Sequence, residues 1–317
     1  EIYQCDWSSD VCSSDLTTSK VLMIRPVRFG FNEQTAVNNS FQKRGYELSA
    51  QEMALQEFDA FVALLRANGV DVIVVEDTPE PHTPDSIFPN NWFSTHSTGE
   101  LVLYPMCAPN RRLERKESVL KAINETGEKG RMKSVVDLTS WESKELFLEG
   151  TGSLIFDRKQ KLAFACRSPR CNLEVLEDFA ERMDYEYLDF GAYDREGKPI
   201  YHTNVMMCVG EKFVVACLDS ITDINERTEF IAFVEDCDKE LVEISMEQME
   251  QFAGNMLQLK SRDGEPLLVM SATAKRALTS EQLEILSSYC KIVAPELESI
   301  EVNGGGSARC MLAEIFF

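Results

Sequence analysis

Basic residues are scarce in this chain compared with acidic ones. The 317 residues include 32 lysines and arginines but 53 aspartates and glutamates, which gives a formal net charge of −21 at pH 7. An acidic surface of this kind repels nucleic-acid phosphates and anionic membranes. The composition therefore argues against a nucleic-acid partner and against a membrane partner, and it is typical of an acidic cytoplasmic protein.

Long apolar runs and histidines are also rare. No apolar run approaches the roughly 20 residues that a membrane-spanning helix needs. The three histidines, His82, His96 and His202, do not combine with cysteines at a spacing that binds zinc. We therefore expect neither a membrane span nor a metal site. His82 and His96 are interpreted as solvated loop histidines.

Cysteines are more frequent, but their distribution argues against disulfides. Ten are present, and Cys166, Cys208 and Cys217 lie within apolar runs. A disulfide framework is typical of short secreted chains, whereas this chain is long and has 44% hydrophobic residues to build a core. These thiols are therefore expected to be reduced core residues, which again favours a cytoplasmic location.

The first 16 residues differ from the rest of the chain. Ser-Ser-Asp occurs twice among them, with neither a basic residue nor an apolar run, so we expect no signal peptide here. The segment Asp10-Val-Cys-Ser-Ser-Asp-Leu16 resembles a translated sequencing adapter. Residues 1–16 are therefore predicted to be a non-native or disordered tail, the alternative being a natural disordered terminus. Residues 17–317 are expected to form one domain.

Helices and strands are predicted to alternate along that domain. Apolar residues recur at helical spacing in five segments, and an apolar run typical of a buried strand follows each. The helices are expected over 49–68, 111–124, 172–183, 224–234 and 279–289, and the strands after them over 70–75, 134–138, 185–188, 241–245 and 291–294. One or two further apolar strands precede each helix, as over 205–209 and 213–217 before the fourth helix. This order favours a closed array of ββαβ-type modules, with a doubly wound sheet as the generic alternative.

Two boundaries in this pattern are predicted from local signals. Ser49, with Glu52 three residues later, is expected to cap the first helix. The charged, glycine-containing stretch 125–133 is expected to be a surface loop rather than a domain boundary.

A cysteine near the C-terminus stands out from the other nine. Gly304, Gly305 and Gly306 free the backbone for close approach to a ligand, and Cys310 follows them before a final apolar run. A thiol in this context is able to face a cavity while its backbone is anchored in the core. The alternative is a buried structural cysteine beside a loop, which is the usual state of a free cysteine.

A nucleophilic cysteine needs a base or a cation that favours its thiolate form. His202 lies where a turn meets an apolar strand, and Glu149 lies at a glycine turn entering another strand. Strand ends are the places where α/β folds assemble their sites. Taken singly, His202 would more often be a hydrogen-bonded structural histidine and Glu149 more often a turn carboxylate.

Four segments taken together resemble a known family. They are Pro84-Asp85-Ser-Ile-Phe-Pro-Asn90-Asn91-Trp92-Phe, Glu149-Gly-Thr-Gly, His202-Thr-Asn204 and Gly304-Gly-Gly-Ser-Ala-Arg-Cys310-Met. Their residues and order are similar to those of the guanidino-group modifying enzymes, which include arginine deiminases, dimethylarginine dimethylaminohydrolases and amidinotransferases. The resemblance is closest to the citrulline-utilisation hydrolases and covers roughly residues 20–317. It implies a five-bladed, pseudo-symmetric α/β propeller with the site in its central channel.

The resemblance also implies roles for three residues. Cys310 would attack the central carbon of a guanidino or ureido group and form a covalent intermediate. His202 would protonate the departing amine and then deprotonate the hydrolytic water. Glu149 would orient the substrate nitrogens and hold His202. No cofactor is expected for this chemistry.

The segments that bind substrate in the family depart from its usual pattern here. Relatives that process arginine place acids against the cationic guanidinium, whereas this chain has Asn90, Asn91 and Asn204 at those places. An amide offers both a donor and an acceptor to a neutral group. The substitution therefore favours a neutral ureido substrate such as citrulline over arginine, although Asp85 would still suit a cation. Ser153, where relatives often carry a second acid, favours the same choice.

An arginine is expected to bind the carboxylate of an amino-acid substrate. Arg170 resembles the family's carboxylate-binding arginine, and a guanidinium suits a carboxylate because it donates two parallel hydrogen bonds. Arg167 is the rival for this role, and a surface position is the alternative for either.

The sequence thus predicts a hydrolase of the C–N bond in a ureido or guanidino amino acid. Related alternatives are an amidinotransferase, in which an acceptor amine replaces water, and an arginine deiminase or dimethylargininase. A catalytically silent propeller that binds a macromolecule is the alternative from another class, since fold alone does not fix function. The expected partner is a small amino acid, and self-association into a homo-oligomer is left open.

Overall fold

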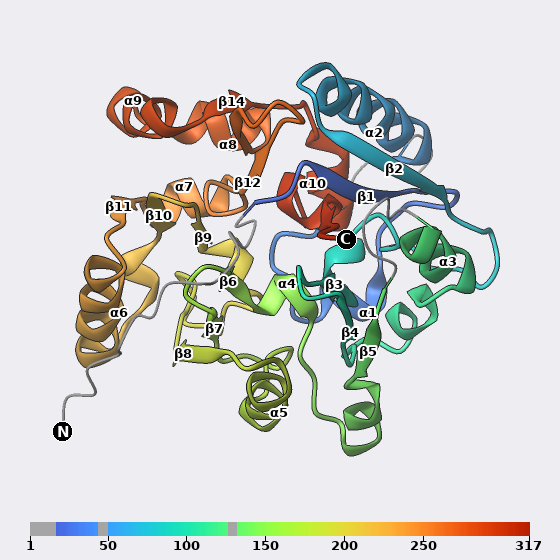
Figure 1. The fold of residues 1–317 in the computed structure, drawn as a ribbon, viewed down its shortest axis with the longest axis horizontal. Coiled ribbons are helices and arrows are strands. Elements are labelled where there is room, and N and C mark those ends of the chain that lie inside the picture. Colours follow the sequence, from blue (N-terminus) through green and yellow to red (C-terminus); the bar gives the residue numbers. More distant parts are fainter. Residues whose placement is uncertain (1–16, 44–49, 126–131) are drawn as a thin grey trace.

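The fold consists of five small sheets arranged around a common centre. The computed structural model describes residues 17–43, 50–125 and 132–317. The strands in this part of the chain form five three-stranded sheets, each with an antiparallel pair and a parallel pair. Figure 1 shows one long helix on the outside of each sheet. The predicted α/β propeller of five ββαβ modules is confirmed, and the doubly wound alternative is wrong.

Four of the modules are continuous in sequence. In each, two antiparallel strands are followed by a helix and by a third strand parallel to the second. They are β3 (Phe93–Thr95), β4 (Glu100–Leu103), α3 (Glu117–Glu125) and β5 (Ser134–Asp137); β6 (Ile155–Asp157), β7 (Leu162–Cys166), α5 (Leu173–Met183) and β8 (Glu186–Phe190); β9 (Met207–Val209), β10 (Phe213–Ala216), α6 (Ile224–Asp236) and β11 (Glu240–Glu243); and β12 (Leu257–Lys260), β13 (Pro266–Val269), α9 (Ser280–Tyr289) and β14 (Lys291–Val293).

The fifth module joins the two ends of the described chain. Strand β1 (Lys20–Arg25) pairs in parallel with β2 (Asp71–Glu76) after helix α2 (Ala50–Ala67). Its other edge pairs antiparallel with β15 (Ala313–Glu314), in the register Val21 to Glu314. The C-terminal strand therefore completes the first sheet and closes the ring. Cys310 lies three residues before β15, which fixes it near the centre, where Figure 1 shows the C-terminus.

Helix α2 shows how the sequence pattern forms a module. Ala54, Phe58, Phe61 and Leu65 lie on one face of the helix and are fully buried. Burying each of the larger side chains contributes about 1.5–3 kcal/mol. Gly69 follows with φ of +79°, a left-handed conformation that ends the helix at low cost. The predicted cap at residue 49 lies outside the described residues.

Short helical turns lie between the strands and the long helices. They are α1 (Glu33–Ala36), η1 (Pro89–Asn91), η2 (Arg111–Glu114), η3 (Thr139–Lys144), α4 (Gly150–Ser153), η4 (Thr203–Val205), η5 (Leu218–Ser220), α7 (Met246–Glu250), α8 (Ala272–Ala277), α10 (Glu298–Gly304) and η6 (Ala308–Met311). Contacts join η1 with α4 and η6, and α4 with η4. These four turns carry most of the predicted site residues, and Figure 1 shows α4 and α10 close to the centre.

Two predicted elements differ from the structure. The helix expected over 111–124 is divided, since η2 ends at Glu114 and α3 begins at Glu117. The side chain of Arg111 folds back onto Glu114, with Nε and Nη2 each 2.9 Å from a carboxylate oxygen, and this closes a short turn. The strand expected from residue 205 begins at Met207, because Thr203–Val205 forms η4. Most of the loop predicted over 125–133 lies outside the described residues.

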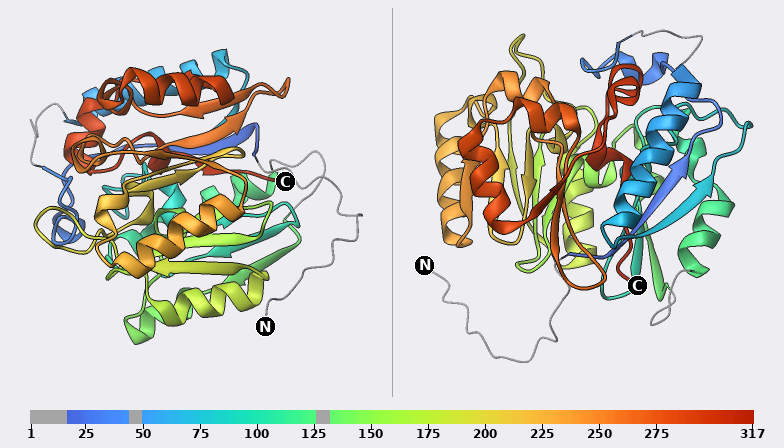
Figure 2. Two further views of the ribbon diagram at one scale, coloured as in Figure 1. Left: turned by 90° about the vertical axis from the view of Figure 1, so that its left-hand side faces the viewer. Right: turned by 90° about the horizontal axis from the view of Figure 1, so that it is seen from above.

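The apolar core is divided among the modules. Strand residues also pack against the helix of the neighbouring module, as Phe164 of β7 and Phe190 of β8 do against Phe230 of α6. Figure 2 shows from two sides that the long helices lie outside the strands. Of the helices in the described residues, none has the length and apolar character needed to cross a membrane. The outer layers thereby hold the central turns in place.

Candidate active site

The central turns bring several predicted residues to one small buried cavity. Cys310 lies on η6, and His202 directly precedes η4. The cavity has a volume of about 20 Å³, which is space for about one water molecule. Its walls are formed by Thr35, Asn39, Asp85, Phe88, Asn91, Arg111, Arg170, Tyr201, His202, Gly304, Gly305, Gly306 and Cys310. Glu149 is fully buried directly behind His202.

Glu149 and His202 form a tight hydrogen bond. Nε2 of His202 lies 2.7 Å from Oε2 of Glu149. Burial opposes ionisation of Glu149, but the charge of Arg170 and the hydrogen bond from His202 together hold the pKa of this carboxyl well below its usual range. Since an ionised carboxylate only accepts, Nε2 of His202 donates and Nδ1 retains its lone pair.

Burial also keeps His202 neutral. It lowers the pKa of His202 to about 4, although Glu149 opposes the change. A neutral imidazole with a free Nδ1 is able to accept a proton near neutral pH. The pair of Glu149 and His202 is thus arranged as a base with an orienting carboxylate behind it.

Glycines in α4 allow the neighbouring turns to approach this pair. Gly150 has φ of +45°, and a Cβ there would lie 2.4 Å from the carbonyl oxygen of Asn90. A Cβ at Gly152 would lie 2.4 Å from Nδ2 of Asn91 and 2.9 Å from the ring of His202. Larger residues would therefore separate α4 from η1 and from the imidazole.

The thiol of Cys310 is surrounded by side-chain amides. Nδ2 of Asn204 lies 3.4 Å from Sγ, and Nδ2 of Asn255 lies 3.3 Å from it. Asn255 also donates to the carbonyl of Asn204 at 3.0 Å and accepts from the backbone N–H of Arg309 at 3.1 Å. It therefore holds both the thiol and the turn that carries it.

Asn255 was not predicted from the sequence as a site residue. The signal available was a Gly254-Asn255 turn just before the apolar strand β12, which is the same kind of signal that marked His202. Gly254 packs so closely that a Cβ would lie 2.3 Å from the carbonyl oxygen of Val205.

Asp85 presents a carboxylate to the cavity. Its Oδ2 accepts from Thr35 Oγ1 at 3.0 Å and from Asn32 Nδ2 at 2.8 Å. Its Oδ1 is buried and has no hydrogen-bond partner among the described residues. Nε of Arg111 lies 3.9 Å from Oδ2, so a cation is near but makes no short contact. One oxygen of Asp85 is therefore free for a ligand.

The predicted asparagines occupy different positions. Asn91 lines the cavity, and Asn204 touches the thiol. Asn90 is fully buried but is not part of the cavity wall, and its backbone carbonyl accepts from Thr151. Among the described residues, the amide of Asn90, Nδ2 of Asn91 and Oδ1 of Asn204 have no hydrogen-bond partner.

Arg170 lies at the cavity, whereas Arg167 does not. Nη1 of Arg170 lies 3.4 Å from Oε2 of Glu149, and Nε donates to Oδ1 of Asn38 at 3.0 Å. Arg167 instead forms surface ion pairs with Asp189 and Glu226. Ser153, the other position noted in the sequence, is buried and donates to the carbonyl of Arg170 at 2.9 Å.

The interpretation of His96 as a solvated loop histidine is wrong. It is buried, with Nε2 3.0 Å from Ser94 Oγ and its ring against Phe156 and Tyr185. Burial lowers the pKa of His96 well below its usual value. His82 is exposed, as expected, with Nε2 3.1 Å from the carbonyl oxygen of Arg28.

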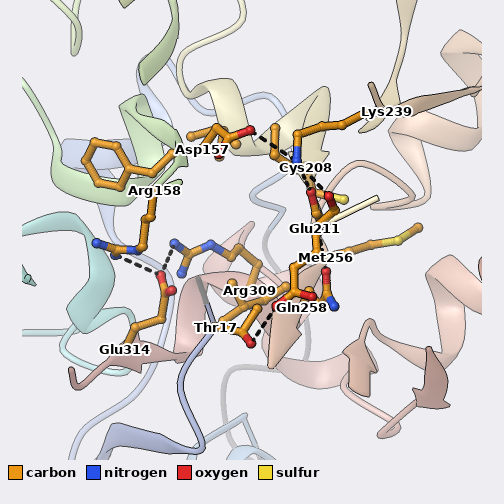
Figure 3. Close-up of a pocket in the computed structure, with 15 residues that line it drawn as sticks. Thr17, Asp157, Arg158, Cys208, Glu211, Lys239, Met256, Gln258, Arg309 and Glu314 are labelled. Atoms are coloured by element: carbon orange, nitrogen blue, oxygen red, sulfur yellow. Dashed lines mark hydrogen bonds and ion pairs between the residues drawn. The ribbon is translucent and has the colours of Figure 1, made fainter. Parts of the chain in front are cut away.

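A second cavity, of about 50 Å³, is lined by Arg309, the residue before Cys310, and by Glu314, and is shown in Figure 3. Arg309, the neighbour of Cys310, points into it and pairs with Glu314 at 3.2 Å. Arg158 reaches the same carboxylate at 3.5 Å. Lys239 pairs with Asp157 at 3.1 Å. The residues that line this second cavity include no predicted site residue.

The site offers no obvious place for a metal. In the portion of the chain that the structure describes, no group of three or more histidines, cysteines, aspartates and glutamates is arranged to hold one. What the arrangement does offer is a thiol, a neutral imidazole with a carboxylate behind it, and several unpartnered polar atoms in one cavity.

Solved structures share this fold. ArgZ, an arginine dihydrolase from the ornithine–ammonia cycle in cyanobacteria, has a TM-score of 0.73 and 17% identity over 93% of this chain and 40% of ArgZ. The N-terminal domain of ArgZ alone gives the same score and identity over 93% of this chain and 97% of the domain. A dimethylarginine dimethylaminohydrolase carrying an S-methyl-L-thiocitrulline adduct has a TM-score of 0.64 and 13% identity over 94% and 99%. The chain thus spans 40% of full-length ArgZ.

Sequence comparison gives the family. No curated protein matches the chain in sequence. The sequence model of the family described as eukaryotic N,N dimethylarginine dimethylhydrolase matches residues 25–317, which is nearly the whole chain. This match confirms the resemblance seen in the motifs. The chain therefore belongs to the N,N dimethylarginine dimethylhydrolase family.

Proposed function

We propose that this chain is a cysteine-dependent hydrolase of the ureido group of a free amino acid such as citrulline. The observation that carries the proposal is the meeting of the Cys310 thiol and the His202–Glu149 pair at one buried cavity. A nucleophile, a base and a group that orients the base are the parts needed for covalent catalysis. Membership of the family supports the same chemistry.

The proposed reaction has two stages. His202 takes the proton of the Cys310 thiol, and Sγ, now a thiolate, attacks the ureido carbon while the C=O electron pair moves onto oxygen. The tetrahedral adduct collapses, the bond to the terminal nitrogen breaks, and His202 delivers the proton that lets it leave as ammonia. A thiocarbamate on Cys310 remains.

Water completes the proposed reaction. His202 takes a proton from water, which attacks the thiocarbamate carbon and releases the Cys310 thiolate. The carbamate product then loses carbon dioxide. Citrulline and one water thereby give ornithine, ammonia and carbon dioxide.

The amides support a neutral substrate. Asn91 faces the cavity and Asn204 contacts the thiol, so donors lie where a ureido oxygen would be. A carboxylate at either place would repel that oxygen, whereas an amide N–H stabilises it. Arg170 supplies a buried guanidinium at the cavity wall, which we propose binds the substrate carboxylate.

A second candidate substrate is arginine. The free Oδ1 of Asp85 favours it, because a buried carboxylate attracts a guanidinium. The names of the similar structures, an arginine dihydrolase and a dimethylarginine dimethylaminohydrolase, support the same candidate. With arginine, the covalent intermediate on Cys310 would be a thiouronium. Transfer to an acceptor amine in place of water would use the same intermediate.

Two wider predictions accompany the proposal. Residues 17–317 are proposed to form a single catalytic domain that needs no cofactor. A cytoplasmic location stays a prediction, which is supported by the free state of the eight described cysteines.

The proposal is tested by incubating the protein separately with citrulline, arginine, methylated arginines and agmatine, and by following ammonia and amino-acid products. We expect ornithine and ammonia from citrulline, with no turnover by Cys310→Ala. Citrulline formed from arginine, without turnover of citrulline itself, would retain the nucleophile and overturn the ureido substrate. Activity that survives in Cys310→Ala would overturn the proposed mechanism.

A further inference from the structure

Arg111 is a buried arginine that the proposed chemistry does not use. It lines the cavity, yet its guanidinium is held from several sides. Nε and Nη2 each donate to an oxygen of Glu114 at 2.9 Å, and Nη2 also donates to the carbonyl of Phe88 at 3.0 Å. Arg111 and Glu114 are both almost fully buried. A guanidinium fixed in this way has little freedom to reorient.

The remaining donor of Arg111 points at Asn91. Nη1 lies 2.7 Å from Oδ1 of Asn91. Since a guanidinium has donors but no acceptor, it fixes which end of the amide it meets. The oxygen of Asn91 must face Arg111, and its NH₂ must face the opposite way.

That NH₂ group lies beside the ring of His202. Nδ2 of Asn91 and the ring of His202 both border the space above Gly152, as the positions around its absent Cβ show. Nδ2 is buried and has no partner among the described residues. A buried donor without a partner is costly to leave unsatisfied, so a ligand that accepts from it gains affinity.

We propose that Arg111, locked by Glu114, makes this site selective for a ureido oxygen by holding the amide of Asn91 with its NH₂ toward the cavity. This inference rests on the proposed hydrolase function. A ureido group has an oxygen that accepts from Nδ2, whereas a guanidinium has only donors and leaves Nδ2 unsatisfied. Arg111 is thus a positioning residue that acts on substrate choice through Asn91.

The orientation of Asn91 would otherwise be free. An asparagine amide presents an oxygen or a nitrogen after a half turn about its last side-chain bond, and the two ends have nearly the same size. With its oxygen toward the cavity, the same residue would accept from a guanidinium. The identity of residue 91 alone therefore does not fix the substrate, and the neighbour that holds the amide does.

The test compares Arg111→Gln with Arg111→Lys. Both change the packing, but lysine is still a donor only, whereas glutamine donates or accepts and does not fix the amide. We expect the ratio of kcat/KM for citrulline to that for arginine to fall roughly 10- to 100-fold in Arg111→Gln and by less than about threefold in Arg111→Lys. Arg112→Gln is the matched control, because Arg112 donates to the carbonyls of Met106 and Cys107 rather than to Asn91.

A second variant keeps the test decisive if Arg111→Gln does not fold. Asn91→Asp replaces the NH₂ with a second acceptor, so it should shift the ratio toward arginine with Arg111 intact. In that background Arg111→Lys should change the ratio no further, because the orientation of residue 91 no longer matters.

The outcomes separate this inference from the proposed function. A wild-type protein that hydrolyses neither substrate overturns the proposed function. A wild type that hydrolyses citrulline, with an unchanged ratio in folded Arg111→Gln or in Asn91→Asp, overturns only the role of Arg111 and Asn91. A wild type that strongly prefers arginine also overturns this inference.

Discussion

The two cavities that η6 borders, one at Arg309 and one at Cys310, differ in how their buried polar atoms are paired. Around Arg309, the buried charges pair with one another: Lys239 with Asp157, and Arg309 and Arg158 with Glu314. Around Cys310, three buried polar atoms have no partner among the described residues, namely Oδ1 of Asp85, Nδ2 of Asn91 and Oδ1 of Asn204. Adjacent residues of one short turn therefore face two different networks. In one the buried charges are paired, although within the part of the chain that the structure describes Oδ2 of Asp157 has only its ion pair with Lys239 and no hydrogen bond; in the other three polar atoms have neither.

This difference in pairing distinguishes polar groups that stabilise the fold from polar groups that are available to a ligand. Buried polar atoms are nearly always hydrogen-bonded, since an unsatisfied one is costly. A charged cavity whose members are paired has little left to offer a ligand. The Cys310 cavity retains unpartnered donors and acceptors, which can form hydrogen bonds with a ligand of complementary polarity. The predictions below test this contrast by changing one cavity at a time.

The largest effect is expected from the two cysteines that border the cavities. Cys310→Ala should lower kcat by at least about 10³-fold, as loss of a nucleophile does, with little change in the urea midpoint. Cys208→Ala, which borders the other cavity, should retain kcat and lose stability of about 1 kcal/mol through a small void. Turnover assays and urea unfolding on both variants check this. Equal activity losses in the two variants would abolish the contrast.

A change in the cavity around Arg309 should alter stability and leave activity unchanged. Lys239→Met removes the partner of buried Asp157, so we expect a loss of about 3–5 kcal/mol in the free energy of unfolding. The kcat per folded molecule should be unchanged. Lys161→Met is the control, because its ion pair with Asp184 is exposed and is worth under about 1 kcal/mol. A fall in kcat with normal stability would show that this cavity takes part in catalysis.

Because His202 at the Cys310 cavity is neutral in the folded protein, the free energy of unfolding should depend on pH. His202 has a pKa of about 4 in the folded protein and an ordinary value of 6.5, so between these values the unfolded state binds more protons. Stability should therefore fall as pH is lowered, by about 2 kcal/mol from pH 7 to pH 5. Glu149 adds a loss of the same sign at lower pH, because its pKa is also lowered.

Urea unfolding at several pH values checks this titration. The decline between pH 7 and pH 5 should be smaller by that amount in His202→Gln. Exposed His82 provides the control, and His82→Gln should keep the wild-type decline. Parallel curves for wild type and His202→Gln would show that His202 is not held neutral.

The smallest effect is expected at Asn255, which holds the thiol without contacting the Glu149–His202 pair. Asn255→Ala removes an N–H donor 3.3 Å from Sγ, so the thiolate should be less favoured and alkylation of Cys310 by iodoacetamide should slow roughly tenfold. Asn68→Ala, in which the lost amide donates to a helix carbonyl, is the control. If Cys310 of Asn255→Ala were alkylated at the wild-type rate at every pH, Asn255 would serve only to hold the backbone of the turn.

Much of the fold was readable from the sequence because the modules depend on local periodicity. Apolar spacing along α2, α5, α6 and α9 predicted each helix to within a few residues. Strands β3 and β12 were not predicted, and β15 has only two residues, too few to show an alternating pattern. Pairing with β1 in three dimensions, rather than local sequence, makes it a strand.

The site was predictable only in part, for a related reason. Three positions could be recognised because their residue types suit catalysis and glycines mark the turns beside them; they are Cys310, His202 and Glu149. Arg111 looked like a polar position on a surface helix, and Asn255 like an ordinary turn residue. Their roles come from contacts with residues 20 and 55 positions away, which local pattern does not encode.

The pairing of β15 with β1 has a consequence for how the protein acquires its shape over time. Val21 and Glu314 are 293 residues apart, and joining such distant strands requires a large loss of chain entropy before any contact is gained. Contacts of this range slow folding. Since Cys310 immediately precedes this strand, a partly folded chain with four finished modules would still lack its thiol at the centre. The meeting of Cys310 with His202 and Glu149 is thus linked to the contact of longest range among the described strand pairs, and we expect it to form late in folding.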